Sequence, residues 1–427
     1  MKRFASLLVL LALVAVAGVW ATGKEEAPKQ PAAPAAVKLT VLNSNTEKPE
    51  RAEFFTRLAE KYHELHPNVT LEVTGTSFTD VNTNILTAIN AGTPYDVFTS
   101  TSPIWINKGV VLNLAPYLEA DGGAWKKELY DSIVQGLTQP DGSVYAMSLW
   151  MDTTPLLFHK EIFQKLNLKV PTNTAEFFAA CDALKGAGYI PFQVHGSMSD
   201  DLLNVFTWQF AAKYNVKAYD VVQGKVPMTD PWFVDSLKFY KDMNDRGYLP
   251  PNFWAMGGTE GRTGYATSKM AMRFGFYWDV DTQKDMGMPY DNQGVAAFPN
   301  ITGTSGLKVY KTLSLQGVMV SKATKSPEHA VGFVRFMTNK DNQDDMAYKY
   351  FGRYPNGMPT VNKAVKLSPY ALSYIGDIAS GVATPYYVGD VSLKFGDVWM
   401  QQLPQLMQGK VTAEQVAAEF EKLRTGK

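Results

Sequence analysis

Hydrophobic and polar positions repeat with two different periods near the start of the chain. Residues 38–42 form a short apolar run that predicts a buried strand. A helical period follows from Glu50, and Pro67 ends it because the residue before a proline disfavours helical backbone. The apolar face of this predicted helix comprises Phe54, Phe55, Leu58, Tyr62 and Leu65.

The next segment repeats the same succession of elements. Residues 69–73 alternate between apolar and polar side chains, as in a strand with one buried face. Asp80 is placed to cap a second helix that Gly92 ends, and residues 95–98 return to strand. This strand–helix–strand–helix–strand order predicts an α/β fold with a mostly parallel sheet covered by helices on both faces.

The remainder of the chain is richer in helical patterns. Four helix starts combine a capping residue with a proline, acidic or amide side chain in the first turn, and they lie at Thr174, Asp230, Ser326 and Thr412. Three short apolar runs predict further strands at residues 270–274, 294–298 and 317–321.

The N-terminus has the pattern of a secretory signal peptide. Lys2 and Arg3 precede an apolar run over residues 4–20, and small residues stand before a cut after Ala21. We therefore predict a signal peptide over residues 1–21 and a periplasmic location. The alternative is an uncleaved membrane anchor, because the apolar run is close to the shortest that can span a bilayer. Residues 22–37 are rich in proline and alanine and predict an extended tether.

Overall charge excludes several classes of partner. The chain has 427 residues, with 41 Lys and Arg against 41 Asp and Glu. Nucleic acids and anionic membranes select basic surfaces, so we expect neither as a partner. A single cysteine cannot form an internal disulfide or a cysteine-based metal site. We expect no metal and no cofactor.

The motifs of common enzymes do not occur in complete form. Residues 257–264 are rich in glycine but lack the glycine–lysine pair of a phosphate-binding loop, and we interpret them as a loop. Cys181 stands among apolar residues of a predicted helix, which favours a buried structural thiol over a nucleophile. Neighbouring acids such as Asp279 and Asp281 could serve a glycosidase, but such pairs are more often solvated or cap helices.

Aromatic residues near predicted strand ends indicate a candidate binding site. The chain has 9 Trp, 21 Tyr and 23 Phe. Trp105, Trp150 and the pair Tyr277–Trp278 stand beside polar residues where strands lead into helices, and Asp279 follows that pair. Ligands of parallel α/β sheets bind outside the carboxyl ends of the strands. An aromatic face can stack on a sugar ring whose hydroxyls bond to nearby polar groups. The alternative is that these aromatic rings belong to the core.

Several short motifs in a fixed order resemble one protein family. They are Phe55…Tyr62…His66-Pro-Asn-Val69, Ala91-Gly-Thr-Pro-Tyr-Asp-Val-Phe98, Gly109-Val-Val-Leu-Asn-Leu114, Val144-Tyr-Ala-Met147, Phe158-His-Lys-Glu-Ile-Phe163, Lys269-Met-Ala-Met272 before Gly275, and Ser326-Pro-Glu-His-Ala330 before Phe333 and Phe336. Over residues 38–427 the chain resembles the maltose-binding-protein-like family of extracellular solute-binding proteins, which supply sugars to ABC importers.

The resemblance implies a two-lobed periplasmic binding protein fold in which each lobe is a mixed or mostly parallel sheet flanked by helices. Lobe 1 would combine residues 38–150 and 300–337, and lobe 2 would combine residues 151–298 and 340–427. The chain would cross between the lobes three times, near residues 149–151, 298–301 and 337–339.

The resemblance also implies which residues line the ligand cleft between the lobes. Together with the aromatic positions above, the expected ligand-binding residues are Ser44, Asn45, Glu47, Ser100, Thr101, Trp105, Trp150, Asp152, Trp208, Arg273, Tyr277, Trp278, Asp279 and Trp399. No catalytic or metal-binding residue is expected.

The function that the resemblance implies is binding without catalysis. A monomeric protein would bind a mono- or oligosaccharide, close about a hinge, and deliver the sugar to the transmembrane permease of an ABC transporter. Two alternatives stay open: a secreted glycoside hydrolase, and a solute-binding protein for a ligand other than a sugar.

Overall fold

The computed structural model describes residues 34–426 with several gaps. The residues that it does not describe within this range are 45, 47, 78, 101, 103, 151–154, 197–198, 218–219, 222, 277–278, 306–309, 313–316, 352–359, 369–381 and 385–393. For residues 199–205, 310–312 and 382–384 only the backbone is described. The chain from Val37 onward forms one compact body, separate from the N-terminal unit that ends at Ala36. The predicted signal peptide and most of the predicted tether lie outside the described residues.

The first of two larger sheets, sheet 1, has the strand order β2-β1-β3-β10-β4. Its strands are β1 (Val37–Asn43), β2 (Val69–Gly75), β3 (Val97–Ser100), β4 (Met147–Ser148) and β10 (Gly317–Val320). Strand β1 is parallel to β2 and β3, as the early strand–helix alternation predicts, whereas β10 is antiparallel to β3 and β4. Sheet 1 is therefore mixed.

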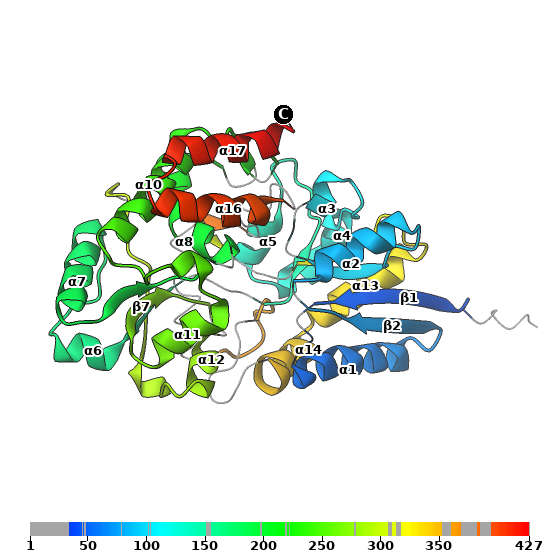
Figure 1. Cartoon of the computed structure of the whole chain (residues 1–427). Helices are drawn as coiled ribbons and strands as arrows, with labels where there is room; N and C mark the ends of the chain where they lie inside the picture. The colour runs from blue at the N-terminus through cyan, green and yellow to red at the C-terminus, as the bar shows by residue number, and fades with distance from the viewer. Residues whose placement is uncertain are drawn as a thin grey trace, which may run out of the picture. The chain divides into compact units, whose positions relative to one another are not determined.

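Helices cover both faces of sheet 1. In Figure 1, β1 and β2 lie between α2 on one side and α1 on the other. Leu39 and Val41 of β1 pack in a first cluster with α1, whereas Leu42 packs with α2 in a separate cluster. The helices of this part are α1 (Pro49–Leu65), α2 (Val81–Asn90), α3 (Ile104–Asn107), α4 (Ala115–Glu128), α5 (Asp131–Leu137), α13 (Pro327–Met337), α14 (Lys340–Asp345) and a π-helix, η3 (Met346–Tyr350).

Sheet 2 has the order β6-β7-β5-β8, with one parallel and two antiparallel pairings. Its strands are β5 (Leu156–His159), β6 (Ile190–Gln193), β7 (Met270–Phe274) and β8 (Gln293–Ala296). Its helices are α6 (Lys160–Lys165), α7 (Thr174–Gly186), α8 (Ser199–Lys213), α10 (Pro231–Asp245), η1 (Phe253–Ala255), α11 (Gly258–Ala266), α12 (Asp279–Asp285), η2 (Tyr290–Asn292), α16 (Phe395–Met407) and α17 (Ala413–Thr425). A separate parallel pair joins β9 (Tyr310–Thr312) to β11 (Val382–Thr384).

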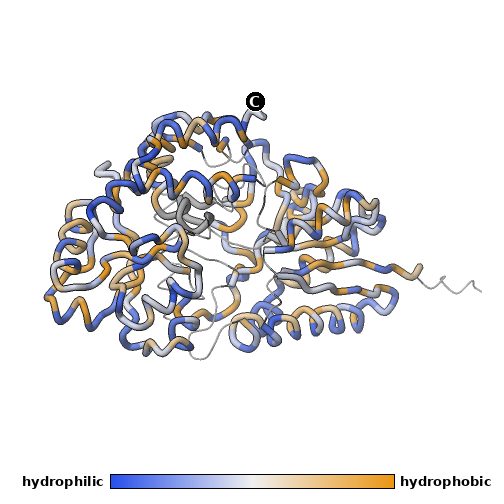
Figure 2. The backbone as a smooth tube through the Cα atoms, in the orientation of Figure 1, coloured by the Kyte–Doolittle hydropathy of each residue, from blue (hydrophilic) through white to orange (hydrophobic). Residues whose placement is uncertain are grey.

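The amphipathic helices follow the sequence pattern closely, with three local differences. Figure 2 shows hydrophilic and hydrophobic positions alternating along α1 and α17. The capping box of α17 is present, with Thr412 and Gln415 bonded reciprocally. However, Leu65 at the end of α1 is 65% exposed, so it does not share the buried face. Asn173 instead of Thr174 caps α7, and the Asp80 side chain accepts a bond from Ser77 without capping α2.

The segment after α13 packs in the same apolar cluster as strand β1 of sheet 1. Met346, Ala347, Tyr350 and Phe351 belong to the first cluster. Polar side chains hold the end of α13 in place: Trp125 Nε1 donates to Thr338 Oγ1 at 2.8 Å, and Asn362 Nδ2 donates to the Thr338 carbonyl at 2.9 Å. This segment was expected to begin the second lobe at residue 340. Seven of its apolar side chains between Met346 and Leu367 belong to the first cluster.

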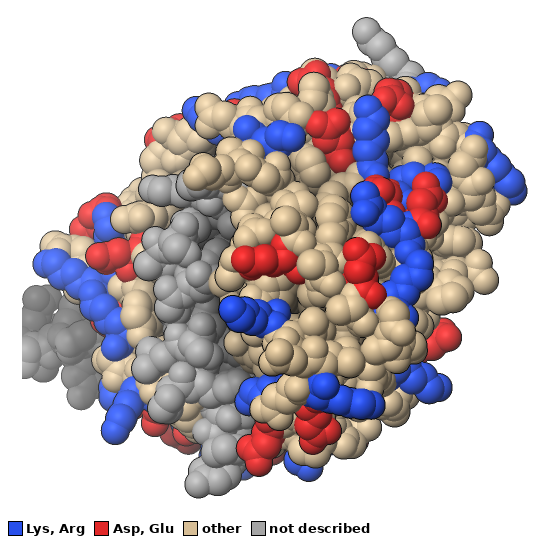
Figure 3. Space-filling view, turned by 90° about the vertical axis from the view of Figure 1, so that its left-hand side faces the viewer, with Lys and Arg blue, Asp and Glu red and all other residues tan. Residues whose placement is uncertain are grey.

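Two properties of the described surface bear on partners. Among the helices that the structure describes, none has both the length and the apolar character that a membrane span requires. Figure 3 shows one face of the molecule, on which basic and acidic side chains are interspersed. That mixture accords with the equal numbers of basic and acidic residues in the sequence.

Candidate functional site

The ends of several strands meet at one edge of sheet 1. Strand β3 ends at Ser100, which pairs with Gly317 at the start of β10. Gly317 also pairs with Ser148 at the end of β4. Strand β1 runs parallel to β3 and ends at Asn43. Because ligands of α/β sheets bind at such carboxyl edges, this edge is the first half of the candidate site.

Two serines that were expected to contact ligand are buried at this edge and bonded within the protein. The Ser44 N–H donates to Thr99 Oγ1 at 2.7 Å, and Thr99 Oγ1 donates to Ser44 Oγ at 3.1 Å. Ser100 Oγ donates to Asn82 Oδ1 at 2.9 Å. The serines are each 1% exposed. The structure thus uses them to order the strand ends. The neighbouring candidates Asn45, Glu47 and Thr101 lie outside the described residues.

Trp105 belongs to the core and not to the edge. It is fully buried in the cluster that joins α2 to sheet 1, with its ring 6.5 Å from that of Phe98. Its Nε1 donates to Ser100 Oγ and to Asn82 Oδ1, both at 3.1 Å. Trp105 lies in α3, the short helix that follows β3, and its indole packs in this cluster and bonds to Ser100.

Asn43 is a polar residue at this edge that the sequence analysis did not single out. Its side chain is 1% exposed, and neither amide atom has a hydrogen-bond partner among the described residues. Buried amides nearly always have partners, so an unsatisfied one needs an explanation such as a ligand or an ordered water. The sequence does carry a signal for this residue. Residues 39, 41 and 43 of a strand share one face, and Leu39 and Val41 both pack in the first cluster, so an apolar residue would be expected at position 43.

Trp150 is the last described residue after β4 at this edge. It is 2% exposed, and its ring lies 5.5 Å from that of Phe351, at an angle of 44°. Its indole N–H also has no partner among the described residues. Residues 151–154, including the candidate Asp152, lie outside the described residues. Trp150 therefore lies two residues after the end of β4, and its ring packs in the first cluster.

Sheet 2 has a corresponding edge, where β7 ends. Leu156 at the start of β5 pairs with Phe274 at the end of β7 and with Ala296 at the end of β8. Gln193 at the end of β6 pairs with Arg273. Because β4 leads to the edge of sheet 1 and β5 begins at this edge, residues 149–155 connect the two edges directly.

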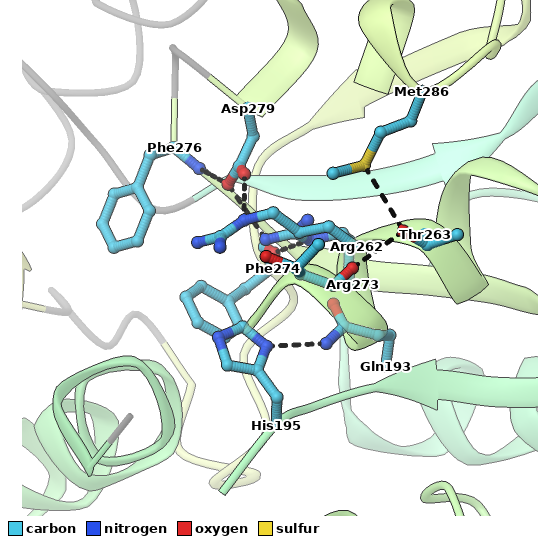
Figure 4. Close-up of polar contacts among 10 residues, drawn as sticks. Gln193, His195, Arg262, Thr263, Arg273, Phe274, Phe276, Asp279 and Met286 are labelled. Atoms are coloured by element: carbon cyan, nitrogen blue, oxygen red, sulfur yellow. Dashed lines mark hydrogen bonds and ion pairs between the residues drawn. The ribbon is translucent and has the colours of Figure 1, made fainter. Parts of the chain in front are cut away.

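A buried network of charged side chains lies at the edge of sheet 2 (Figure 4). Asp279 at the start of α12 and Arg273 of β7 are both fully buried and are joined by an ion pair of 3.0 Å. Arg262 of α11 makes a second ion pair with Asp279, at 3.1 Å. Arg273 and Asp279, both expected to contact ligand, thus bond to each other. Tyr277 and Trp278, which lie between Phe276 and Asp279, are outside the described residues.

A second polar pair lies beside this network. Gln193 Nε2 and His195 Nδ1 are 2.8 Å apart, and both side chains are buried (Figure 4). Helix α11 approaches this pair so closely that a Cβ at Gly261 would lie 2.5 Å from Gln193 Nε2. A side chain at position 261 would therefore require the Gln193 amide to shift. The glycine-rich run, expected to be a loop, instead begins helix α11 and packs against the edge of the sheet.

Two of the expected tryptophans lie in the helical core around sheet 2. Trp208 of α8 is 1% exposed and Trp399 of α16 is fully buried. Both belong to the apolar cluster that joins sheet 2 to α10 and α17, and the Trp399 ring lies 6.0 Å from that of Phe420. Their burial accords with the core interpretation that the sequence analysis kept as an alternative.

The far edge of sheet 2 carries a buried histidine. His159 ends β5, opposite the edge where Leu156 begins it. Its Nε2 donates to the Tyr265 carbonyl at 2.7 Å, and burial lowers its pKa below the ordinary value. No group of three His, Cys, Asp or Glu side chains that could hold a metal occurs in the part of the chain that the structure describes.

Comparison with known proteins places this architecture in a family. A model of the family described as "Bacterial extracellular solute-binding protein" matches residues 45–344. The chain belongs to the bacterial extracellular solute-binding proteins. No curated protein sequence matches it.

Solved structures of this kind share the fold over most of the chain. A chitin oligosaccharide binding protein is 21% identical, with a TM-score of 0.73 over 92% of this chain and 98% of the other. The GacH receptor of Streptomyces glaucescens, solved with acarbose, is 18% identical, with a TM-score of 0.69 over 91% and 99%. RafE in complex with raffinose is 17% identical, with a TM-score of 0.67 over 91% and 99%. These likenesses confirm the predicted α/β fold of the solute-binding type, and the number of crossings stays a prediction.

Proposed function

We propose that this solute-binding protein binds a mono- or oligosaccharide between the carboxyl edges of sheets 1 and 2 and delivers it to the permease of an ABC importer. The observation that supports this most directly is the direct link between the two edges through residues 149–155. Strand ends bearing polar groups on two sheets can contact a ligand from both sides. Binding would then favour a closed state through contacts that only that state makes.

The ligand class rests on the structural neighbours and on side-chain chemistry. The neighbours' names include a chitin oligosaccharide, acarbose and raffinose as ligands of those proteins. In this proposal, Trp278 would offer a stacking surface and Asp152 a hydroxyl acceptor, the two features that suit a neutral sugar. Asn43 adds a buried amide without a described partner at the edge of sheet 1. We propose these residues as the ligand contacts, with Asn45, Glu47, Thr101 and Tyr277 beside them.

The buried candidates have a different role in this proposal. Trp105, Trp208 and Trp399 support the two cores, while Ser44 and Ser100 order the strand ends of sheet 1. We further propose that the protein acts as a periplasmic monomer without catalysis. In support of this, both carboxylate oxygens of Asp279 accept bonds from arginines, which leaves that acid poorly suited to glycoside cleavage.

Isothermal titration against a panel of neutral sugars tests the function, with an amino-acid and peptide panel as the control. We expect saturable binding to at least one sugar and recovery of that sugar unchanged, as shown by mass spectrometry of the mixture. Binding confined to amino acids or peptides would refute the ligand class. Release of shorter sugars from an oligosaccharide would replace binding with hydrolysis.

A further inference from the structure

A mostly apolar groove lies at the edge of sheet 1 opposite the proposed sugar site. Strand β3 runs from Val97 at this edge to Ser100 at the sugar edge, and Val97 pairs with Val320 at the end of β10. The groove has a volume of about 510 Å³. Pockets for small molecules span roughly 300–1,000 Å³. We refer to it as the β3 groove, and its lining comes from described residues between 85 and 98, from residues 109–110 and from residues 321–323.

The buried part of the β3 groove is apolar and packed against the core. Ile85 of α2, the helix beside β1 in Figure 1, is 1% exposed, and Phe98 of β3 is 2% exposed. The Phe98 ring lies 6.5 Å from that of the fully buried Trp105. Ile89 and Val110 are half-buried and line the groove nearer the surface. Because the buried residues are held in the cluster that joins α2 to sheet 1, the groove is preformed.

Two glycines explain why the chain does not fill the β3 groove with its own side chains. Gly92 follows α2 and Gly109 follows α3, and both line the groove. Their φ angles are +74° and +67°, in the left-handed region that glycine adopts without strain and that often ends helices. A Cβ at either position would meet no atom within 4 Å. The two helix ends therefore leave open space beside the groove.

Lysines gather at one side of the β3 groove. Lys322 is the only charged residue among the described residues that line it. Val111 and Ser321 form an antiparallel bridge, so Lys108 and Lys325 continue from the same end of this short pairing, just beyond Lys322. All three lysines are exposed, and none has an ion-pair partner in the described part of the chain.

The single acid within the lining segments is bonded to threonines instead of a lysine. Asp96 Oδ2 accepts bonds from the Thr40 N–H at 2.8 Å and from Thr40 Oγ1 at 3.0 Å. Asp96 Oδ1 accepts a bond from the Thr324 hydroxyl at 2.6 Å. Helix α2 carries no charged residue. Three lysines against one carboxylate thus leave a local positive charge, in a chain whose total charges balance.

We propose that the β3 groove binds a single-chain amphiphile with an anionic head, such as a fatty acid. The alkyl chain lies on Ile85, Ile89 and Phe98, where burial of its methylene groups drives binding. The carboxylate lies at Lys322, which attracts it. The carbonyl dipoles at the C-terminal end of α2 repel an anion, so the head lies on the lysine side of the groove. This site is separate from the proposed sugar site and does not depend on sugar binding.

Other occupants fit the β3 groove less well. The hydroxyls of a sugar would meet mostly apolar side chains, and a neutral ligand would gain nothing from Lys322. A stable protein interface buries about 800 Å² per partner, whereas this groove has the volume of a small-molecule pocket. A flat bilayer surface cannot enter a recessed groove. The combination of apolar depth and cationic rim therefore selects one amphiphile.

Isothermal titration with fatty acids tests the proposal, at concentrations below those at which they form micelles. We expect saturable binding of one dodecanoate per chain. Affinity should rise from octanoate to dodecanoate by up to about fourfold per methylene group. Dodecyltrimethylammonium has the same chain with a cationic head, and we expect it to bind more weakly. Equal binding of the two amphiphiles, or no binding of dodecanoate, would overturn the proposal.

Charge reversal at the rim locates the binding site. Lys322 is exposed, so Lys322→Glu should keep the fold. We expect it to weaken dodecanoate binding by about fivefold and to strengthen dodecyltrimethylammonium binding, because attraction and repulsion exchange places. Lys410→Glu is the matched control, since it changes the net charge equally at an exposed position after α16. The same loss of dodecanoate affinity in both variants, or in neither, would show that dodecanoate binds elsewhere.

A second variant and a second assay complete the test. Ile89→Asn places an amide in the apolar part of the groove, and we expect it to weaken both amphiphiles alike. Co-sedimentation with phosphatidylglycerol vesicles separates a free amphiphile from a membrane surface, and we expect the protein to stay in solution. Co-sedimentation without binding of monomeric dodecanoate would overturn the proposal in favour of a membrane surface. None of these measurements uses a sugar, so failure of the proposed sugar function would leave their outcome unchanged.

Discussion

A Cβ atom at Gly196 would lie 2.4 Å from the Cα atom of Trp254. The same Cβ would lie 3.0 Å from Leu403 Cδ2, and the Gly196 N–H donates to the Phe253 carbonyl at 2.8 Å. Backbone thus packs on backbone where the chain leaves β6, directly after His195. Only glycine allows this contact without a shift of the chain.

We therefore expect Gly196→Ala to destabilise the protein by about 1–3 kcal/mol or more, because the added methyl group overpacks the site. Urea unfolding followed by circular dichroism measures the change. Gly186→Ala in α7 is the matched control, since a Cβ there meets nothing within 4 Å. It should be neutral or stabilising by about 0.5–1 kcal/mol. Equal stability of the two variants would contradict the prediction.

His159 should make stability depend on pH. Burial lowers the pKa of His159 in the folded protein, whereas in the unfolded chain it protonates near pH 6.5. The unfolded state therefore binds the proton first as the pH falls. Stability contributed by the neutral imidazole is present above about pH 6.5 and declines below it, by up to about 1.4 kcal/mol per pH unit.

We expect His159→Gln to lose less stability than the wild type between about pH 7 and pH 5, because glutamine does not titrate in this range. Unfolding free energies measured across this range give the comparison. His63→Gln is the control, since His63 is exposed on α1. Parallel pH profiles for the wild type and His159→Gln would show that His159 does not cause the dependence.

Cys181 should react only after the protein unfolds. Its side chain is fully buried in α7, and burial raises the pKa of the thiol well above its ordinary value. The thiolate is the reactive form, so both access and ionisation are blocked. We expect no reaction with Ellman's reagent in native buffer, and one thiol per chain in urea. Rapid labelling without denaturant would place Cys181 at the surface or in a locally opening helix.

Gln209 should anchor the segment that was expected to form the second crossing. Its Nε2 donates to the Pro299 carbonyl at 3.0 Å, and its Oε1 accepts from the Ile301 N–H at 2.9 Å. Gln209 is 4% exposed. Gln209→Leu would leave both backbone groups without these partners, and we expect a loss of roughly 2–4 kcal/mol in the unfolding free energy.

Gln401→Leu is the control for Gln209, because Gln401 is exposed on α16. It should change stability by less than about 0.5 kcal/mol. Denaturant unfolding of both variants distinguishes a specific anchor from a general effect of replacing glutamine by leucine. A loss in Gln209→Leu no larger than that of the control would show that water replaces the bonds at little cost.

Much of the local structure could be predicted from the sequence, because it depends on neighbouring residues. Strand β7 spans Met270–Phe274 as predicted, and Thr412 begins α17 with its capping box. The parallel pairing of β1 with β2 and β3 follows from the connecting helices. The place of β10 between β3 and β4 could not be predicted in this way, because that pairing joins segments far apart in the chain.

The site was harder to predict than the fold, for a physical reason. A tryptophan in a helix or loop has the same local pattern whether its ring faces a ligand or the core, and Trp105, Trp208 and Trp399 are all buried. The arginine partners of Asp279 come from two other elements, so no spacing in the sequence reveals them. Asn43 could have been noticed in the sequence as a polar residue on the buried face of a strand. One asparagine alone, however, indicates no particular ligand.

The central place of β10 in sheet 1 has a consequence for how the protein acquires its structure. Ser100 and Ser148 both pair with Gly317, so neither β3 nor β4 has this neighbour until the ribosome has made β10. Until then, the nascent chain exposes unpaired strand edges of the kind that aggregate. Synthesis of sheet 1 thus begins first, with β1, but its strand β10 is made after all the strands of sheet 2, which precede Gly317. A chain that ended before Gly317 would lack the strand that joins β3 to β4.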